Sequence, residues 1–224
     1  MTRDLVVFDM DGVLVDVRES YRETICRTVG HFTGRAITRD LVQEYKNRGG
    51  WNNDWALSHR IAADLGADVP YEAVVEHFQE LFLGANGEGL IGREQWIPTS
   101  GLLDSLAARF ELAIFTGRPN LEAALTLRRF AVESRFRPVI CHEDVAAGKP
   151  APDGLLKIAA LRPGAKLWYV GDTLDDARSA RAAGAPFIGV AAAHVHGRDA
   201  LVESFRRDGA GAVIENVNEI GKVL

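Results

Sequence analysis

The chain has 224 residues, of which 47% are hydrophobic and 25% charged, and a formal net charge of -5. These values are typical of a soluble globular protein with one large domain or a domain with an insert, and they leave no basic footprint for nucleic acid. No apolar run approaches the ~20 residues of a membrane span, so we expect no membrane partner. Because residues 1–4 lead directly into the first predicted strand, and because Cys26 and Cys141 cannot make a disulfide framework, we expect no signal peptide and a cytoplasmic location.

The first predicted strand ends in two carboxylates. Residues 5–8 form an apolar run that is typical of a buried parallel strand, and Asp9 and Asp11 follow it directly. Gly12 allows a sharp turn after the pair. Ligands of open α/β sheets bind beyond the carboxyl ends of the strands. The sequence therefore predicts a site at Asp9 and Asp11, where two close carboxylates need a shared proton or a cation between them.

The next segment has helical periodicity throughout. Asp16, with Glu19 three residues on, predicts a capping box for the first helix, and Gly34 is the expected stop. Thr38 is the expected cap of a second helix, and two further helical patterns follow before a glycine-rich segment. An insertion of this size is rarely a simple loop, so residues 16–98 are predicted to form an all-helical cap domain.

The remaining chain alternates strands and helices. Repeated strand–helix units predict a Rossmann-like α/β core, a parallel sheet of about six strands with helices on both faces. The expected strands after the first are residues 112–115, 138–141, 167–170, 187–190 and 212–214. The core is thus predicted to comprise residues 1–15 and 99–224, with hinges to the cap near residues 12–17 and 84–98, the latter containing Gly87.

Four pieces with polar side chains lie at matching places in this α/β pattern. Asp9 and Asp11 follow the first strand, and Thr116-Gly117-Arg118 follow the strand at 112–115. Lys149 precedes Pro150, and Gly171-Asp172 through Asp176 follow the strand at 167–170. Each piece is weak alone, but their order, spacing and strand context resemble the four motifs of the haloacid dehalogenase-like hydrolases, a superfamily of mostly Mg²⁺-dependent phosphatases. The resemblance covers essentially the whole chain.

The resemblance implies roles for the acidic residues. Asp9 is expected to be the nucleophile that forms an aspartyl phosphate, and Asp11 the general acid–base. Mg²⁺ prefers oxygen ligands, and Asp9, the Asp11 carbonyl and Asp172 would supply them. Either Asp175 or Asp176 could hold metal-bound water, and the offset from Asp172 favours Asp176. Simple complementarity to a helix dipole is the alternative explanation for both.

The remaining motif residues are expected to bind the phosphoryl group. Thr116 can donate its hydroxyl, and the amides of Gly117 and Arg118 can join it. The Arg118 side chain touches either substrate or only the surface. Lys149 supplies a positive charge to Asp9 and the phosphoryl group.

One stretch of the predicted cap breaks the helical periodicity with two glycines. Residues 46–55 concentrate cations, amides and indoles, and their position resembles the cap loop that faces the active site in related enzymes. On this interpretation Lys46 or Arg48 pairs a second anionic group of the substrate, and Trp51 packs against the substrate body. The alternative is a solvated turn with two core tryptophans.

The sequence therefore predicts a Mg²⁺-dependent phosphatase for a small phosphomonoester metabolite, similar to phosphoglycolate phosphatase and β-phosphoglucomutase-like members of the superfamily. Phosphoglycolate, a sugar phosphate or an amino-alcohol phosphate such as histidinol phosphate are the expected substrates. Dehalogenases of the superfamily lack an acid at the position of Asp11, which argues against that activity. A phosphomutase and a non-enzymatic binding module on the same fold remain as alternatives.

Overall fold

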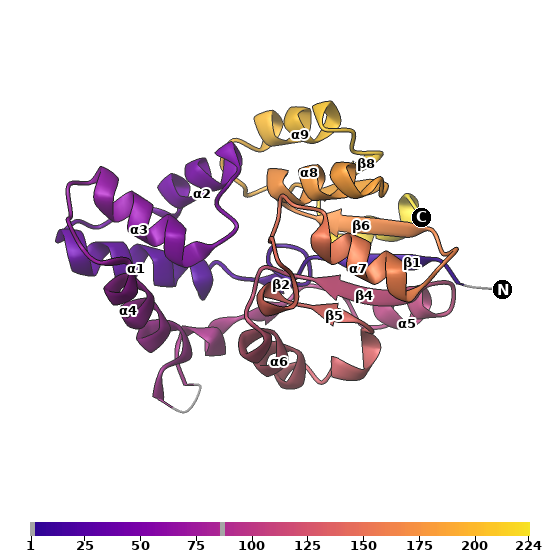
Figure 1. Ribbon diagram of the computed structural model, residues 1–224, viewed down its shortest axis with the longest axis horizontal. Coiled ribbons are helices and arrows are strands. Elements are labelled where there is room, and N and C mark those ends of the chain that lie inside the picture. The colour runs from indigo at the N-terminus through magenta and orange to yellow at the C-terminus, as the bar shows by residue number, and fades with distance from the viewer. Residues whose placement is uncertain (1–2, 86–87) are drawn as a thin grey trace. The chain divides into compact units, whose positions relative to one another are not determined.

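The computed structural model describes residues 3–85 and 88–224. The chain divides into two compact units (Figure 1). The first contains the chain up to Val15 together with Trp96–Leu224, and the second is Asp16–Gln95. In the described part of the chain, no helix is both long enough and apolar enough to cross a membrane.

The first unit is built on a six-stranded sheet whose paired strands all run parallel. Residues 5–8 pair with 111–114 on one side and with 167–170 on the other, so the first strand lies inside the sheet. This confirms the predicted fold class. In spatial order the strands are β5 (Val139–Ile140), β4 (Glu111–Phe115), β1 (Leu5–Phe8), β6 (Leu167–Gly171), β7 (Phe187–Val190) and β8 (Ala212–Ile214).

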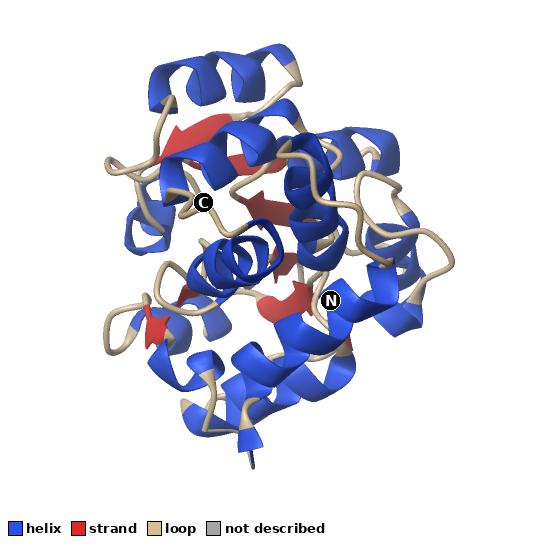
Figure 2. Cartoon of the chain, turned by 90° about the vertical axis from the view of Figure 1, so that its left-hand side faces the viewer, coloured by secondary structure: helices blue, strands red, loops and turns tan. Residues whose placement is uncertain are grey.

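Helices cover both faces of the sheet (Figure 2). Alternate residues of the strands, such as Val7, Phe115 and Tyr169, share one hydrophobic cluster with α7 (Asp153–Leu161), α8 (Leu174–Ala183) and α9 (Arg198–Arg207), as the two-residue period of a strand requires. The other regular segments of this unit are α5 (Leu102–Ala107), α6 (Asn120–Arg129) and the short 3₁₀ turns η3 (Glu133–Arg135), η4 (His142–Asp144) and η5 (Val217–Lys222).

The second unit is a bundle of helices around its own apolar core. Its α-helices are α1 (Tyr21–Thr33), α2 (Arg39–Arg48), α3 (Asp54–Asp64) and α4 (Tyr71–Leu83), followed by the 3₁₀ turn η2 (Leu90–Arg93). The rings of Tyr21 and Phe82 lie 4.1 Å apart between α1 and α4. All the expected helical patterns of residues 16–85 thus form helices.

The helix ends test the sequence prediction in detail. Thr38 caps α2 by accepting a hydrogen bond from the Leu41 amide, and Gly34 ends α1 with a φ of 67°, both as predicted. The prediction that Asp16 caps the first helix is wrong. Its carboxylate instead accepts hydrogen bonds from the backbone and guanidinium of Arg18, and α1 begins four residues later than that cap would place it.

The chain passes between the units through two strands that the sequence pattern does not reveal. They are β2 (Val15–Asp16) and β3 (Gln95–Trp96), which pair with each other. Residues 86–87 of the expected second hinge, including Gly87, lie outside the described residues. That the second unit acts as a cap, with hinges near residues 12–17 and 84–98, stays a prediction.

Candidate active site

The candidate site lies where the order of the strands reverses. The chain forms β1, adds β4 and β5 on one side, and then places β6 to β8 on the other. Such a switch point opens a crevice at the carboxyl ends of the strands. Asp9 directly follows β1, Thr116 follows β4, and Asp172 follows β6. The topology therefore brings three of the four motifs together, although more than 100 residues separate the first from the second.

Lys149, the third motif in chain order, links the first and fourth motifs through a buried ion network. The Lys149 ammonium lies 2.7 Å from Oδ1 of Asp9 and 2.8 Å from Oδ1 of Asp176. The side chains of Lys149 and Asp176 are fully buried, and that of Asp9 is 7% exposed. The ammonium also lies 5.1 Å and 5.5 Å from the ring centres of Phe115 and Tyr169, close enough for cation–π attraction. Lys149 is therefore held between two carboxylates and two rings.

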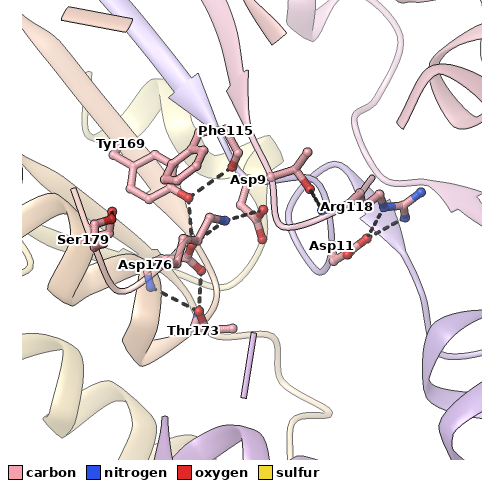
Figure 3. A network of polar contacts seen from close by, with 11 residues as sticks. Asp9, Asp11, Phe115, Arg118, Tyr169, Thr173, Asp176 and Ser179 are labelled. Atoms are coloured by element: carbon pink, nitrogen blue, oxygen red, sulfur yellow. Dashed lines mark hydrogen bonds and ion pairs between the residues drawn. The ribbon is translucent and has the colours of Figure 1, made fainter. Parts of the chain in front are cut away.

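Asp176 is the best-satisfied carboxylate of the network. Its Oδ1 also accepts a hydrogen bond of 2.7 Å from the Tyr169 hydroxyl, and its Oδ2 accepts from the amide and hydroxyl of Thr173 (Figure 3). Thr173 in turn accepts from the Asp176 amide, so the two residues form the capping box of α8. Sequence analysis assigned no role to Tyr169 or Thr173. Two sequence signals could have indicated them. One is the Thr173-x-x-Asp176 spacing, which is typical of a capping box, and the other is Tyr169 in a buried strand, where its hydroxyl needs a polar partner.

The charges of this network do not balance. Burial raises the pKa of Asp9 to about 7, and Lys149 offsets this only in part. Burial also opposes ionisation of Asp176, but Lys149 and the hydrogen bonds from Thr173 and Tyr169 outweigh it and lower that pKa. Burial disfavours the Lys149 ammonium, yet the two carboxylates raise its pKa. Lys149 is thus charged, and Asp176 neutralises most of its charge. Asp9 is therefore under-compensated, which means that too little positive charge faces it to favour its ionised form.

This imbalance predicts how the stability of the metal-free protein depends on pH. The pKa of Asp9 rises on folding from its ordinary value of 3.8 to about 7, so the folded state binds more protons than the unfolded state between these values. Stability linked to Asp9 is therefore lost as pH rises through this window. In chelator, Asp9→Asn should be more stable than the parent, and the difference in the free energy of unfolding should be larger at pH 8 than at pH 5. Urea denaturation at both values measures this, and a difference that does not grow with pH would contradict it.

The cluster of acidic side chains has the composition of a metal site. Carboxylate oxygens of Asp9, Asp172 and Asp176 all lie within 4.8 Å of one another. Gly12 makes this approach possible, because a Cβ atom there would lie 2.0 Å from Oδ2 of Asp172, and its φ of 73° favours glycine. Hard oxygen donors around an excess negative charge fit Mg²⁺. Within this cluster, both oxygens of Asp176 also accept hydrogen bonds from Tyr169 or Thr173.

The second carboxylate of the first motif belongs to a separate network. Oδ1 of Asp11 accepts hydrogen bonds from Nε and Nη2 of Arg118, at 2.8 Å and 2.5 Å (Figure 3). The Arg118 amide donates to the hydroxyl of Thr116. Thr116 is buried and Gly117 half-buried, in the loop between β4 and α6. The structure thus brings the predicted phosphoryl-binding residues together, but the Arg118 side chain is buried against Asp11.

The predicted substrate-binding residues of the cap lie where α2 ends and the loop to α3 begins. Lys46 is buried and forms an ion pair with Asp54. Arg48 is exposed, with its guanidinium 4.9 Å from the centre of the Tyr45 ring. Trp51 is half-buried, and its ring meets that of Tyr45 edge to face at 6.2 Å. Arg48 and Trp51 thus share one aromatic neighbour, whereas Lys46 already has a carboxylate partner.

Comparison with known sequences decides the family. Residues 3–184 match the family described as haloacid dehalogenase-like hydrolase. The chain belongs to this family. The dehalogenase-like resemblance of the four motifs is therefore confirmed, and so is the prediction that the chain is a hydrolytic enzyme.

Several individual proteins resemble this dehalogenase-like chain. It is 34% identical over 222 residues to an imidazoleglycerol-phosphate dehydratase of Phytophthora nicotianae, covering 95% of this chain but 48% of that protein. It is 26% identical over 208 residues to a phosphoglycolate phosphatase of Pseudomonas putida, covering 89% and 74% of the two chains. A crystal structure of a putative β-phosphoglucomutase from Thermotoga maritima superposes with a TM-score of 0.70 at 23% identity, covering 99% and 100%. This chain spans about half of the Phytophthora relative, so the dehydratase activity in that name does not carry over.

Proposed function

We propose that the chain is a Mg²⁺-dependent phosphatase that hydrolyses a small phosphomonoester metabolite of the cytoplasm through an aspartyl-phosphate intermediate. The observation that carries this proposal is the position of Asp9, an under-compensated buried carboxylate at the carboxyl end of β1 with Lys149 at 2.7 Å. The family match and the phosphatase names of several relatives support it.

The first chemical step would be attack by Asp9 on phosphorus. Lys149 binds Oδ1 of Asp9, and no group in residues 3–85 or 88–224 donates a hydrogen bond to Oδ2, which is therefore the oxygen available for attack. As the P–O bond to the leaving group breaks, Asp11 gives that oxygen a proton. Asp9 then carries the phosphoryl group as an acyl phosphate, and Lys149 faces the charge on the phosphoryl oxygens.

The second step would hydrolyse the acyl phosphate. Asp11, now a carboxylate, takes a proton from the attacking water, and the P–O bond to Asp9 breaks to release inorganic phosphate. Thr116 and the amide of Gly117 lie on the loop after β4, where they can bind phosphoryl oxygens in both steps.

Asp9, Asp172 and the Asp11 carbonyl would hold the metal ion. Bound Mg²⁺ neutralises charge, which allows a phosphate dianion to approach an acidic site. Asp176 is better assigned to positioning, because its oxygens bind Lys149, Tyr169 and Thr173. We propose this role in place of the metal-bound water expected at Asp176, whose carboxylate also lies within 4.8 Å of those of Asp9 and Asp172.

Removal of the metal provides the test of this part of the proposal. Exhaustive chelation should abolish phosphate release from a panel of small phosphomonoesters, and added Mg²⁺ should restore it. Asp172→Ala should raise the Mg²⁺ concentration needed for half-maximal activity by roughly 10- to 100-fold, as losses at metal sites do. Asp199→Asn, which changes a fully exposed acid outside the acidic cluster, is the control. Activity that persists in chelator would exclude a metal-dependent mechanism.

A phosphomutase is the second candidate, since both carboxylates of the first motif are present and a structural neighbour carries a mutase name. A mutase would pass the phosphoryl group back to a bound intermediate instead of to water. Steady release of phosphate without any bisphosphate supports the phosphatase. Turnover that requires a sugar bisphosphate supports the mutase.

The residues that select the substrate are proposed to include Arg48 and Trp51. If the exposed Arg48 binds a second anion of the substrate, Arg48→Ala removes a contact worth ~1.5–3 kcal/mol, which lowers kcat/KM by about 10- to 100-fold. Trp51→Ala should likewise impair the natural substrate more than 4-nitrophenyl phosphate, which has no second anion. Arg60→Ala changes another exposed arginine of the same unit and is the matched control. Equal losses on both substrates would assign the stretch to folding.

A further inference from the structure

Arg118 is an unusual arginine, because its side chain is only 1% exposed and lies in a loop beside a candidate active site. A buried guanidinium requires hydrogen-bond partners for its planar set of donors. Nε and Nη2 both bind Oδ1 of Asp11, and Nη1 binds the hydroxyl of Thr126 at 2.7 Å. The three donors therefore link the first motif to helix α6, on which Thr126 is fully buried.

The backbone of Arg118 is fixed as firmly as its side chain. The Arg118 amide donates to the Thr116 hydroxyl, and the Arg118 carbonyl accepts a hydrogen bond of 2.9 Å from the His142 amide. These contacts tie the loop after β4 to the segment after β5. The backbone of Arg118 is therefore held in place while its guanidinium binds Asp11.

The contact with Arg118 makes the two oxygens of Asp11 inequivalent. Both hydrogen bonds fall on Oδ1, and across the described ranges 3–85 and 88–224 no donor reaches Oδ2. The Asp11 side chain is 27% exposed, so its carboxylate is partly open to solvent while Arg118 is not. The Arg118 guanidinium thus fixes the position of Oδ1 and leaves Oδ2 available.

We propose that Arg118 is the positioning residue for the general acid–base, which rests on the phosphatase function proposed above. Arg118 holds Oδ1 of Asp11 so that Oδ2 carries the proton to the leaving oxygen, and Thr126 holds Arg118. The side chain of Arg118 acts through Asp11 and does not bind substrate, in place of the substrate contact that its position in the second motif suggests.

The dependence of the rate on the leaving group tests this role. 4-Nitrophenyl phosphate and 4-nitrobenzyl phosphate have similar shapes, but the first expels a stabilised phenolate that needs no proton, whereas the second expels an alcohol that does. A well-placed general acid contributes roughly 10²–10⁴-fold to such steps. Arg118→Met should lower kcat/KM for the benzyl ester by about 30- to 100-fold and for the aryl ester by less than about 5-fold. Equal losses on both esters would overturn the proposal.

Thr126 provides a test that leaves the buried charge in place. Thr126→Val removes the hydroxyl that binds Nη1 with little change in volume, and it should lower kcat/KM for the benzyl ester by about 3- to 10-fold with the same selectivity. Thr126→Ser keeps the hydroxyl and should restore most of the loss. If Arg118→Met does not fold, this pair decides the question, and equal behaviour of the two Thr126 variants on both esters would overturn the proposal.

Failure of the inference is distinguishable from failure of the proposed function. The parent must release phosphate from both esters, and Asp11→Asn must lower kcat/KM selectively for the benzyl ester, because hydrolysis of the acyl phosphate, in which Asp11 acts as the base for either ester, affects kcat and not kcat/KM. If the parent hydrolyses neither ester, or if Asp11→Asn lowers kcat/KM equally for both, the phosphatase mechanism is wrong. If those results hold and only the Arg118 and Thr126 variants lack selectivity, the assignment of Arg118 is wrong.

Discussion

Asp9→Asn is expected to abolish turnover while leaving the protein folded. The amide keeps the shape of the side chain and an oxygen that can accept a hydrogen bond from Lys149, but it is a poor nucleophile towards phosphorus. Loss of a nucleophile that acts together with an acid–base lowers kcat on the order of 10⁴-fold or more. The measurement is phosphate release from the best substrate of the panel, with circular dichroism to verify folding.

The parent protein supplies the complementary result. Rapid acid quench during turnover should trap a phosphoryl group on the peptide that contains Asp9, as identified by mass spectrometry. Asp9→Ala, which cannot revert to aspartate by deamidation, serves as the second variant. A folded Asp9→Ala protein with substantial activity would refute covalent catalysis at this residue.

Lys149→Met is expected to damage both catalysis and stability. Methionine fills much of the same volume, but Asp9 and Asp176 would then face each other without the cation that lies 2.7 Å and 2.8 Å from them. Breaking a buried ion pair costs about 3–5 kcal/mol, part of which is avoided if Asp9 takes up a proton. Loss of a preorganised charge at the phosphoryl group should lower kcat by roughly 10²–10³-fold.

A double variant separates these two effects. Lys149→Met with Asp176→Asn removes the cation together with the carboxylate that mainly neutralises it, so no uncompensated charge is added. The double variant should regain much of the stability lost in Lys149→Met, measured by urea denaturation, without regaining turnover. If turnover returns with stability, Lys149 serves the fold alone.

The fold could be predicted from the sequence because its signals are local. Apolar runs such as residues 5–8 mark strands that are buried on both faces, and Thr38 and Gly34 mark helix ends by their own conformational preferences. Asp9, Thr116 and Asp172 could be placed together for a similar reason, since parallel strands end at one edge of the sheet. The two-residue strands β2 and β3 carry no periodicity, so pairing between distant segments alone defines them.

The partners of the charged side chains could not be predicted in the same way. Asp16 has a cap-like spacing with Glu19, but the adjacent Arg18 guanidinium competes for its carboxylate and holds it. Arg118 follows a strand as a substrate-binding residue would, and only the three-dimensional path of α6 brings Thr126 to its other end. Long side chains can reach several partners, so sequence spacing does not determine which one they bind.

The capping box of α8 has a consequence for how this protein can evolve. Asp176 completes the first turn of that helix through Thr173 and also neutralises Lys149 beside Asp9. A substitution at Asp176 that impairs activity therefore also weakens a secondary-structure element that packs against β6 and β7. Purifying selection for a folded protein would remove such substitutions even in a lineage that no longer needed the activity. We expect Asp176 to persist in inactive descendants for this reason, and Asp11 likewise, because it pairs with the 1% exposed guanidinium of Arg118.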